Sequence, residues 1–150
     1  MKGTDLHWRV LTFSALTVEL LYAILRLRTD VFVVEQACAY PELDGHDGSA
    51  LHIVGTDESG KVVAYARIRP PDKSGRPTIG RVVVAEAARG HGLGRQLMQV
   101  CMDALSEHYG DTRCKLSAQA HLTSLYAHFG FRIVSEEYLW DGIPHIDMER

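Results

Sequence analysis

The segment of residues 79–105 constrains the fold of this chain more than any other part of it. It contains the β-branched run Val82, Val83 and Val84, then a glycine-dense stretch at residues 89–94, then apolar residues at the spacing of an amphipathic helix. A strand, a glycine loop and a helix in this order form a cradle for a phosphorylated ligand. The glycines let the backbone approach the ligand, and the helix N-terminus presents N–H groups to an anion. The sequence therefore predicts an anion site at residues 89–95.

The positions of the glycines decide which phosphate ligand fits. A dinucleotide fingerprint, G-x-G-x-x-G, would need a third glycine where Arg95 or Leu97 stands, and a nucleotide P-loop, G-x-x-x-x-G-K-[ST], occurs nowhere in the chain. The pattern present is Arg89-x-x-Gly92-x-Gly94. Such a short pattern also occurs in ordinary turns between a strand and a helix, so the rest of the chain has to decide its meaning.

Composition narrows the class of protein. The 150 residues, 46% of them hydrophobic and 23% charged, are typical of one globular domain, which we expect to span residues 1–150. A net charge of -3 argues against a nucleic-acid partner. Cys38, Cys101 and Cys114 are widely spaced and form no C-x-x-C, which argues against a disulfide framework or a zinc knuckle and for a reducing compartment. With neither a signal peptide nor a membrane-length apolar stretch, we expect a cytoplasmic protein with no membrane association.

Periodicity and turn residues predict an alternation of strands and helices. An irregular acidic segment covers residues 36–49, and Thr17 is expected to cap the first helix. The order of elements mixes hairpins with a crossover unit, which indicates an α/β architecture with a mixed sheet. The predicted strands cover residues 8–13, 51–56, 61–69, 78–84, 115–119, 131–138 and 145–148, and the predicted helices cover residues 17–31, 93–108 and 121–129, the last closed by Gly130.

The pattern Arg89-x-x-Gly92-x-Gly94 resembles the Q/R-x-x-G-x-G/A pyrophosphate loop of the GNAT superfamily of acyl-CoA N-acyltransferases. Residues 120–131 resemble its second hallmark, a helix ending in Tyr-x-x-x-Gly-Phe. Residues 27–36 with Asp44-Gly45, and residues 141–146, resemble the small bacterial ElaA-type branch, so that the similarity spans residues 8–149. The resemblance implies a GNAT-like fold, a mostly antiparallel mixed sheet flanked by helices on both faces.

By this resemblance the ligand is an acyl-CoA, most often acetyl-CoA, bound without a metal. The backbone of Val82, Val83 and Val84 would bond the pantetheine arm, although these valines also fit a plain buried strand. Gln119 stands where relatives often carry an Asn that contacts the arm. The residues expected to hold the pyrophosphate are Arg89, Gly90, His91, Gly92, Leu93, Gly94 and Arg95.

Tyr126 is the expected general acid. When an amine attacks a thioester, sulfur leaves as a thiolate, and a nearby hydroxyl lowers that barrier. In the superfamily the tyrosine of this helix often has that role. The alternative is an aromatic ring that only packs beside Leu122, Leu125 and Phe129.

The acceptor amine has to lose a proton before it attacks. At pH 7 this costs roughly 4.6 kcal/mol for a lysine-type amine and about 1.4 kcal/mol for an amine with a pKa near 8, so the first class needs a general base. Better-studied relatives carry an acidic base on the central strand, where this chain has Gly80 and Arg81, and the base is therefore left open. The first candidates are Glu35, otherwise a surface carboxylate, and His145, otherwise a strand-edge residue; Asp44, His52 and Glu86 stand behind them.

The sequence thus predicts an enzyme that transfers an acetyl group from acetyl-CoA to a primary amine, small molecule or peptide, by direct attack in a ternary complex. No cysteine has the surroundings of a nucleophile. The alternative is a non-catalytic acyl-CoA-binding module that keeps the loop and lacks turnover. The acidic segment around Asp44 lacks a calcium-loop pattern. It either attracts a cationic amine or forms a solvated turn, and a His/Asp transition-metal site is a further alternative. The oligomeric state is open, with a homodimer paired through the sheets as one arrangement.

Overall fold

The computed structural model of the protein describes residues 5–150. Residues 1–4 lie outside the described residues. The predictions that a single domain begins at residue 1 and that the N-terminus carries no signal peptide fall partly on them. Within residues 5–150, no helix combines the length and the apolarity that a membrane span requires.

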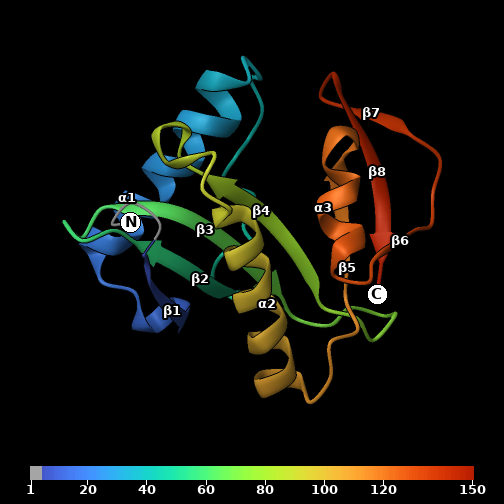
Figure 1. Cartoon of the computed structure of the whole chain (residues 1–150), viewed down its shortest axis with the longest axis horizontal. Helices are drawn as coiled ribbons and strands as arrows, with labels where there is room; N and C mark the ends of the chain where they lie inside the picture. The colour runs from blue at the N-terminus through green and yellow to red at the C-terminus, as the bar shows by residue number, and fades with distance from the viewer. Residues whose placement is uncertain (1–4) are drawn as a thin grey trace.

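Strands and helices alternate along the chain much as predicted (Figure 1). The strands are β1 His7–Thr12, β2 Leu51–Thr56, β3 Val62–Arg69, β4 Thr78–Val84, β5 Lys115–Gln119, β6 Arg132–Ile133, β7 Tyr138–Trp140 and β8 Ile143–Glu149. The α-helices are α1 Val18–Arg28, α2 Leu93–Tyr109 and α3 Thr123–His128. A π-helical stretch, η3 Thr29–Glu35, extends α1, and short 3-10 turns are η2 Phe13–Ala15, η4 Glu86–Ala88 and η5 Ala120–Leu122.

The strands form one sheet in the order β1-β2-β3-β4-β5-β8-β6, with β7 also paired to β8. The β4–β5 pair is parallel and the other described pairs are antiparallel. The expected mixed, mostly antiparallel sheet is confirmed.

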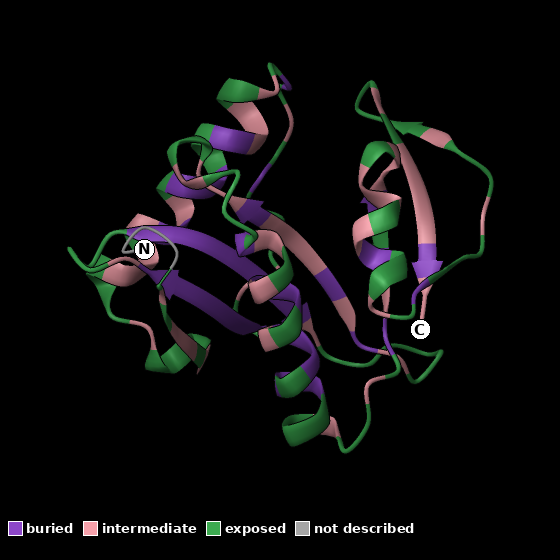
Figure 2. Cartoon of the chain, viewed as in Figure 1, coloured by how far each residue is buried: buried purple, intermediate pink, exposed green. Residues whose placement is uncertain are grey.

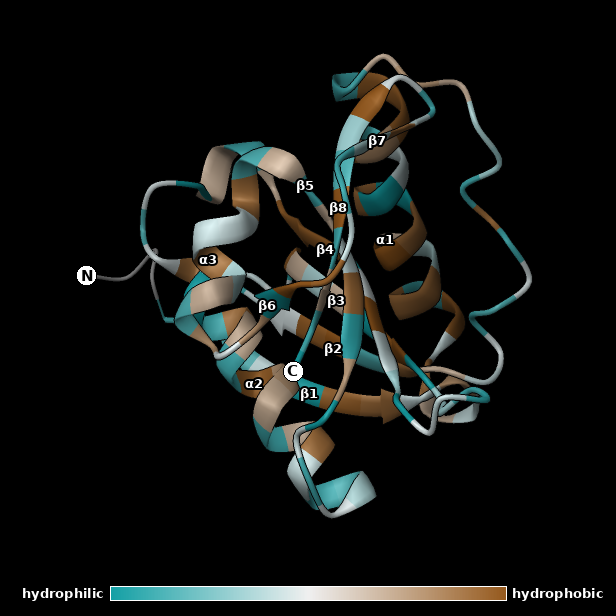
Figure 3. Cartoon of the chain, turned by 90° about the vertical axis from the view of Figure 1, so that its right-hand side faces the viewer, coloured by the Kyte–Doolittle hydropathy of each residue, from teal (hydrophilic) through white to brown (hydrophobic). Residues whose placement is uncertain are grey.

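Helices cover both faces of this sheet, also as predicted. Successive residues of β2 point to opposite faces: Ile53 packs in one buried cluster with Leu97 of α2, and Val54 packs in another with Ile24 of α1. Tyr126 of α3 belongs to the α2 cluster, so α2 and α3 lie on one side of the sheet and α1 on the other (Figure 3). Strands β2 and β3 between them are almost entirely buried (Figure 2).

The centre of the sheet is splayed. Strands β4 and β5 pair at one register position, Thr78 with Lys115, and diverge toward their carboxyl ends. The sheet therefore opens into two halves, one built on β1–β4 and the other on β5–β8. A bulge in β4 accompanies the opening: Arg81 has φ 53°, and the pairing with β3 shifts around it.

The caps and turns of the helices follow the sequence closely. The Thr17 side chain accepts a 3.1 Å hydrogen bond from the Leu20 N–H at the start of α1. Gly130 follows α3 with φ 88°, as a terminating glycine does. The helix predicted over residues 17–31 differs in one respect, because its last turns widen into the π-helical stretch η3 Thr29–Glu35.

The strand predicted over residues 131–138 is wrong as a single element, since the structure has the short strands β6 and β7 there. Both pair with β8, and a side chain interrupts the ladder between them. Val134 N–H donates to the Asp147 carbonyl at 2.9 Å, but the Asp147 N–H donates to the Ser135 hydroxyl, also at 2.9 Å. The strand predicted over residues 145–148 begins two residues earlier: Asp141 and Gly142, with φ 50° and 80°, make a two-residue hairpin turn, and β8 begins at Ile143.

Candidate functional site

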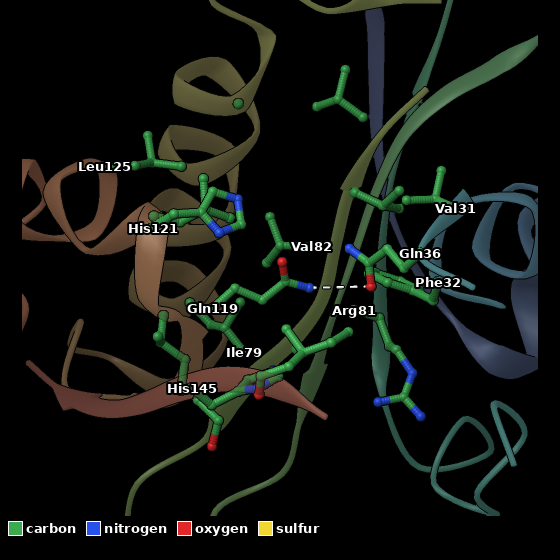
Figure 4. A pocket seen from close by; sticks show the side chains of 18 of the residues that line it. Val31, Phe32, Gln36, Ile79, Arg81, Val82, Gln119, His121, Leu125 and His145 are labelled. Carbon is green, nitrogen blue, oxygen red and sulfur yellow. Dashed lines mark hydrogen bonds between the residues drawn. The ribbon is translucent and has the colours of Figure 1, made fainter. Parts of the chain in front are cut away.

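A cleft of about 560 Å³ lies where β4 and β5 diverge, bounded by η3, the start of α2, α3 and the β7–β8 hairpin. Val82, Gln119 and His145 face it from three strands (Figure 4). Of the residues expected to form the site, those that line the cleft are Glu35, Val82, Val83, Val84, Arg89, Gly90, Gly92, Leu93, Gly94, Gln119, Tyr126 and His145. His91 and Arg95, which are exposed, do not line it.

The glycine cradle, residues 89–95, lies at the carboxyl end of β4 and opens α2. Gly90 has φ 87° and Gly92, the residue before the helix, has φ 75°. A Cβ at either position would meet no heavy atom of the described residues within 4 Å, so the left-handed backbone, and not crowding inside the chain, favours glycine there. No side chain caps α2, and its first-turn N–H groups are therefore available to an anion.

Arg89 and Glu35 form a two-pronged ion pair beside the cradle. Arg89 Nη1 and Nη2 donate to the two carboxylate oxygens of Glu35 at 2.7 and 3.0 Å, and Arg89 Nε donates to the Val84 carbonyl at 3.0 Å. The hydrogen bond from Arg89 lowers the pKa of Glu35. A carboxylate held in this way is a weaker proton acceptor, so the geometry favours an anchoring role for Glu35 over that of a base.

The position of Tyr126 is compatible with both of the roles that the sequence left open. Its side chain is buried and packs edge-to-face on Phe131, with ring centroids 6.1 Å apart. It nevertheless lines the cleft. Burial raises the pKa of Tyr126, so its hydroxyl keeps its proton at neutral pH and can donate it.

His145 has one ring nitrogen engaged by the backbone. Its Nδ1 lies 2.7 Å from the Ile143 carbonyl oxygen, which can only accept a hydrogen bond. In the neutral ring Nδ1 therefore carries the proton, and Nε2 carries a lone pair. The ring stacks on Tyr138 at 6.2 Å and lies 5.5 Å from Trp140, which fixes its orientation. His145 is thus a base-capable group on the wall of the cleft.

Gln119 is the cross-strand partner of His145 and reaches across the cleft. Its Nε2 donates to Gln36 Oε1 at 3.3 Å, the dashed line in Figure 4. A second contact joins the same two sides, from Cys38 Sγ to the Asp141 carbonyl oxygen at 3.5 Å. Residues 36–38 therefore connect the two halves of the molecule.

The acidic segment is neither a solvated turn nor a free negative loop, because buried arginines neutralise it. Arg67 donates to both carboxylate oxygens of Asp44, at 2.8 and 2.5 Å. These ion pairs belong to a larger set, called the ion cluster below: Arg28, Arg67 and Arg81 paired with Glu42, Asp44 and Asp47. The hydrogen bond from Arg67 holds the pKa of Asp44 well below its usual range. Asp44 is therefore poorly suited to act as a base.

The remaining base candidates lie away from the cleft lining. His52 is fully buried, with Nδ1 2.6 Å from the Tyr65 hydroxyl and Nε2 2.9 Å from the Asp47 carbonyl oxygen. Glu86 is exposed on η4. Neither lines the cleft.

Several lining residues have no counterpart in the sequence predictions. Arg67 and Arg69 come from β3, Cys38 and Tyr40 from the segment after η3, and Trp140 from the end of β7. No motif marks them, since they meet only when the sheet is assembled. One signal was available: Cys38 and Trp140 adjoin the two stretches, residues 27–36 and 141–146, that carry the branch resemblance.

The sequence and the fold of this chain are both similar to those of known acyltransferase-family proteins. The family model for the acetyltransferase (GNAT) domain matches residues 27–150. The chain is 47% identical to protein ElaA of Escherichia coli K12 over 148 residues, covering 97% of this chain and 96% of that one. Among solved structures, it is similar to an acyl-CoA N-acyltransferase from Pseudomonas aeruginosa, with a TM-score of 0.92, 47% identity, and coverage of 97% of this chain and 99% of that one. E. coli ElaA gives a TM-score of 0.90 at 45% identity, again with coverage of 97% and 99%.

Proposed function

The chain belongs to the GNAT family of acetyltransferases, and on that premise we propose that it transfers an acetyl group from acetyl-CoA to a primary amine. Membership makes the protein an acyltransferase with a CoA-type co-substrate. The observation that carries the finer proposal is the convergence of the glycine cradle, Tyr126 and His145 on one cleft. The acceptor is a small molecule or a peptide that meets the thioester in a ternary complex.

The residues present suit a CoA co-substrate. The glycine cradle offers backbone donors to a pyrophosphate without a metal. Within the described residues β4 pairs with β5 only at Thr78, so the backbone of Val82, Val83 and Val84 on that side is available to the amides of a pantetheine arm. Gln119, on the opposite wall, adds an amide that can exchange its partner Gln36 for the arm.

The proposed reaction uses two side chains. His145 Nε2 takes a proton from the amine, whose nitrogen attacks the carbonyl carbon of the thioester. A C–N bond forms and the C–S bond breaks, with the electron pair leaving on sulfur. The second proton that the nitrogen loses as the amide forms neutralises the thiolate, which leaves as the CoA thiol. The Tyr126 hydroxyl donates toward that sulfur and lowers the cost of the thiolate. No covalent acyl-enzyme is needed. Of the three free cysteines, Cys101 and Cys114 do not line the cleft, and the Sγ of Cys38, which does line it, donates to the Asp141 carbonyl oxygen.

The surroundings of the protein are part of the proposal. Cys38, Cys101 and Cys114 are unpaired thiols, as is usual in the reducing cytoplasm. We propose that the protein acts in the cytoplasm without nucleic-acid or membrane partners. Its oligomeric state, for which a homodimer is one arrangement, is measured alongside its activity.

Thiol release from acetyl-CoA over a panel of primary amines tests the proposed function. Calorimetry with desulfo-CoA measures binding separately from turnover. Binding together with turnover on an amine supports the enzyme. Tight binding with no turnover on any amine would identify a non-catalytic acyl-CoA-binding module, and no heat at millimolar ligand would remove the glycine cradle as a CoA site.

A further inference from the structure

The cleft is basic at the end opposite the glycine cradle. The cradle follows the last residue of β4, whereas Arg69 and Arg67 pair with Thr78 and Gly80 at the start of that strand. Arg67, Arg69 and Arg81 all line the cleft. The carboxylates of the ion cluster, Glu42, Asp44 and Asp47, are not among its lining residues.

The charges within the ion cluster balance, whereas the positive charge of Arg69, outside the cluster, is not paired among the described residues. Its three guanidinium groups face three carboxylates, so the cluster is neutral as a unit. Arg69 has no ion pair or side-chain hydrogen bond with any residue in the described range 5–150. The acidic lining residues are Glu35, which is bound to Arg89 near the cradle, and Asp141 in the exposed β7–β8 turn. A cationic group entering at Arg69 would therefore meet like charge.

Arg67 adds a donor that lacks an acceptor. Its side chain is only 3% exposed, and its Nη atoms are used by Asp44 and Asp47. Its Nε is buried and has no hydrogen-bond partner among the described residues. A buried N–H without an acceptor is costly, and an anionic oxygen supplied by a ligand would satisfy it.

Arg69, at the basic end of the cleft, and His145, the proposed base, lie on the same face of the sheet. Arg69 is opposite Thr78, and Thr78 is opposite Lys115, so these three side chains share a face. Ser117 and Gln119 follow Lys115 at alternate positions of β5, and Gln119 is opposite His145. Leu116 and Met148, by contrast, belong to the cluster under α2 on the other face.

From this arrangement we propose that the acceptor is a primary amine that also carries a carboxylate, such as an amino acid or a short peptide with a free carboxyl end. The carboxylate binds Arg69, with Arg67 Nε as a further donor, and the amine lies toward His145. A guanidinium suits this task because its planar donors match the two oxygens of a carboxylate. The inference rests on the proposed function, since it names the substrate of that same site.

Matched pairs of amines that differ by one carboxylate test the inference. Lysine is compared with 1,5-diaminopentane, β-alanine with ethylamine, and glycylglycine with its amide, by thiol release from acetyl-CoA. We expect the carboxylate member of at least one pair to have a kcat/KM roughly 10- to 100-fold higher, the size of effect that a hydrogen-bonded charge supplies. In Arg69→Gln that preference disappears, mainly through a higher KM for the amine that carries the carboxylate. Arg132→Gln, an exposed arginine on β6 that does not line the cleft, is the control and keeps the preference.

The outcomes separate this inference from the proposed function. Turnover with equal kcat/KM for both members of every pair, or a preference that survives Arg69→Gln, overturns the inference and leaves the enzyme intact. If no amine reacts, calorimetry with each amine on the desulfo-CoA complex decides. Heat for the carboxylate member alone, lost in Arg69→Gln, supports the inference, and its absence overturns it. Failure of desulfo-CoA itself to bind overturns the proposed function instead.

Discussion

The side-chain amide of Gln119 donates to that of Gln36 at 3.3 Å across the cleft. Gln119 ends β5 and Gln36 follows η3, so the bond joins the half of the molecule built on β5–β8 to the half built on β1–β4. A pantetheine arm between β4 and β5 would compete with Gln36 for the Gln119 amide. Binding of the arm would therefore be linked to this contact between the two halves of the molecule.

This competition predicts opposite effects for the two glutamines. Gln119→Ala removes a contact to the arm and should weaken desulfo-CoA binding about 2- to 10-fold, the usual value of one hydrogen bond. Gln36→Ala removes the competitor and should leave binding unchanged or strengthen it. Calorimetry measures both, with Gln99→Ala, exposed on α2, as the control. Equal weakening by both cleft variants would show that the bond itself, and not Gln119 alone, supports binding.

Gly92→Val should raise the Kd for CoA at least about 10-fold, because the β-branched residue disfavours the left-handed backbone that aims the cradle's N–H groups. Strain of about 1–2 kcal/mol should also lower the free energy of unfolding. Gly60→Val is a matched control, since Gly60 has φ 86°, no described heavy atom near its Cβ position, and a place in the β2–β3 turn. It should lose similar stability and keep its CoA affinity. Unchanged affinity in Gly92→Val would refute the cradle.

Tyr126→Phe keeps the packing against Phe131 and removes only the hydroxyl. We expect kcat to fall by about 10- to 1,000-fold while CoA affinity changes little, because in the proposed reaction the hydroxyl assists the departure of the sulfur and does not hold CoA in the ground state. Tyr109→Phe, a partly buried tyrosine at the end of α2, is the control and should be fully active. A wild-type rate in Tyr126→Phe would reduce Tyr126 to a packing residue.

His145→Gln and Glu35→Gln distinguish the two leading candidates for the base. His145→Gln should lower kcat by about 100-fold or more with little change in the KM for acetyl-CoA, since in the proposed reaction Nε2 takes the proton of the amine. Glu35→Gln should act mainly on that KM, because it breaks the ion pair that positions Arg89 beside the cradle. Steady-state kinetics with both substrates varied gives the split. The assignment is reversed if Glu35→Gln carries the loss of kcat.

The sequence was informative where the signal is local. The strand predicted at residues 115–119 coincides with β5, and Thr17 caps α1 as its position predicts. The glycine cradle was located because glycines at fixed spacing mark a backbone conformation, which Gly90 and Gly92 indeed adopt.

The rest depends on partners that are distant in the chain. Arg67 and Asp44 are 23 residues apart, and nothing in their spacing announces an ion pair. Such pairs form only when the sheet assembles. The sequence alone therefore predicts that the acidic segment is a solvated turn or a loop that attracts a cationic amine. The left-handed backbone of Arg81 in β4 could not be predicted from the local sequence either, since a non-glycine residue takes that conformation only where the surrounding structure enforces it. The break between β6 and β7 depends on one serine hydroxyl that replaces a backbone partner.

The Arg67–Asp44 pair predicts how stability depends on pH. The hydrogen bond from Arg67 lowers the pKa of Asp44 in the folded state relative to about 3.9 in the unfolded chain. A depressed carboxyl pKa stabilises the fold fully above the unfolded value, and this stabilisation is lost as the pH falls below about 4. Burial lowers the pKa of His52, so protonating it opposes folding and stability should begin to decline earlier, below about pH 6.5.

Asp44→Asn tests this dependence. At pH 7 it should cost about 2 kcal/mol, or roughly 4–8 °C in Tm, because Arg67, 3% exposed, loses a charged partner. The difference from the wild type should shrink as the pH falls toward 3, because Asp44 is then largely protonated in the unfolded wild-type chain and its ion pair in the folded state adds less stability. Glu58→Gln, an exposed carboxylate in the β2–β3 turn, serves as the control and should follow the wild-type curve. Thermal unfolding from pH 3 to 8 measures all three proteins, and a deficit in Asp44→Asn that stays constant with pH would mean that the pair does not stabilise the fold through its charge.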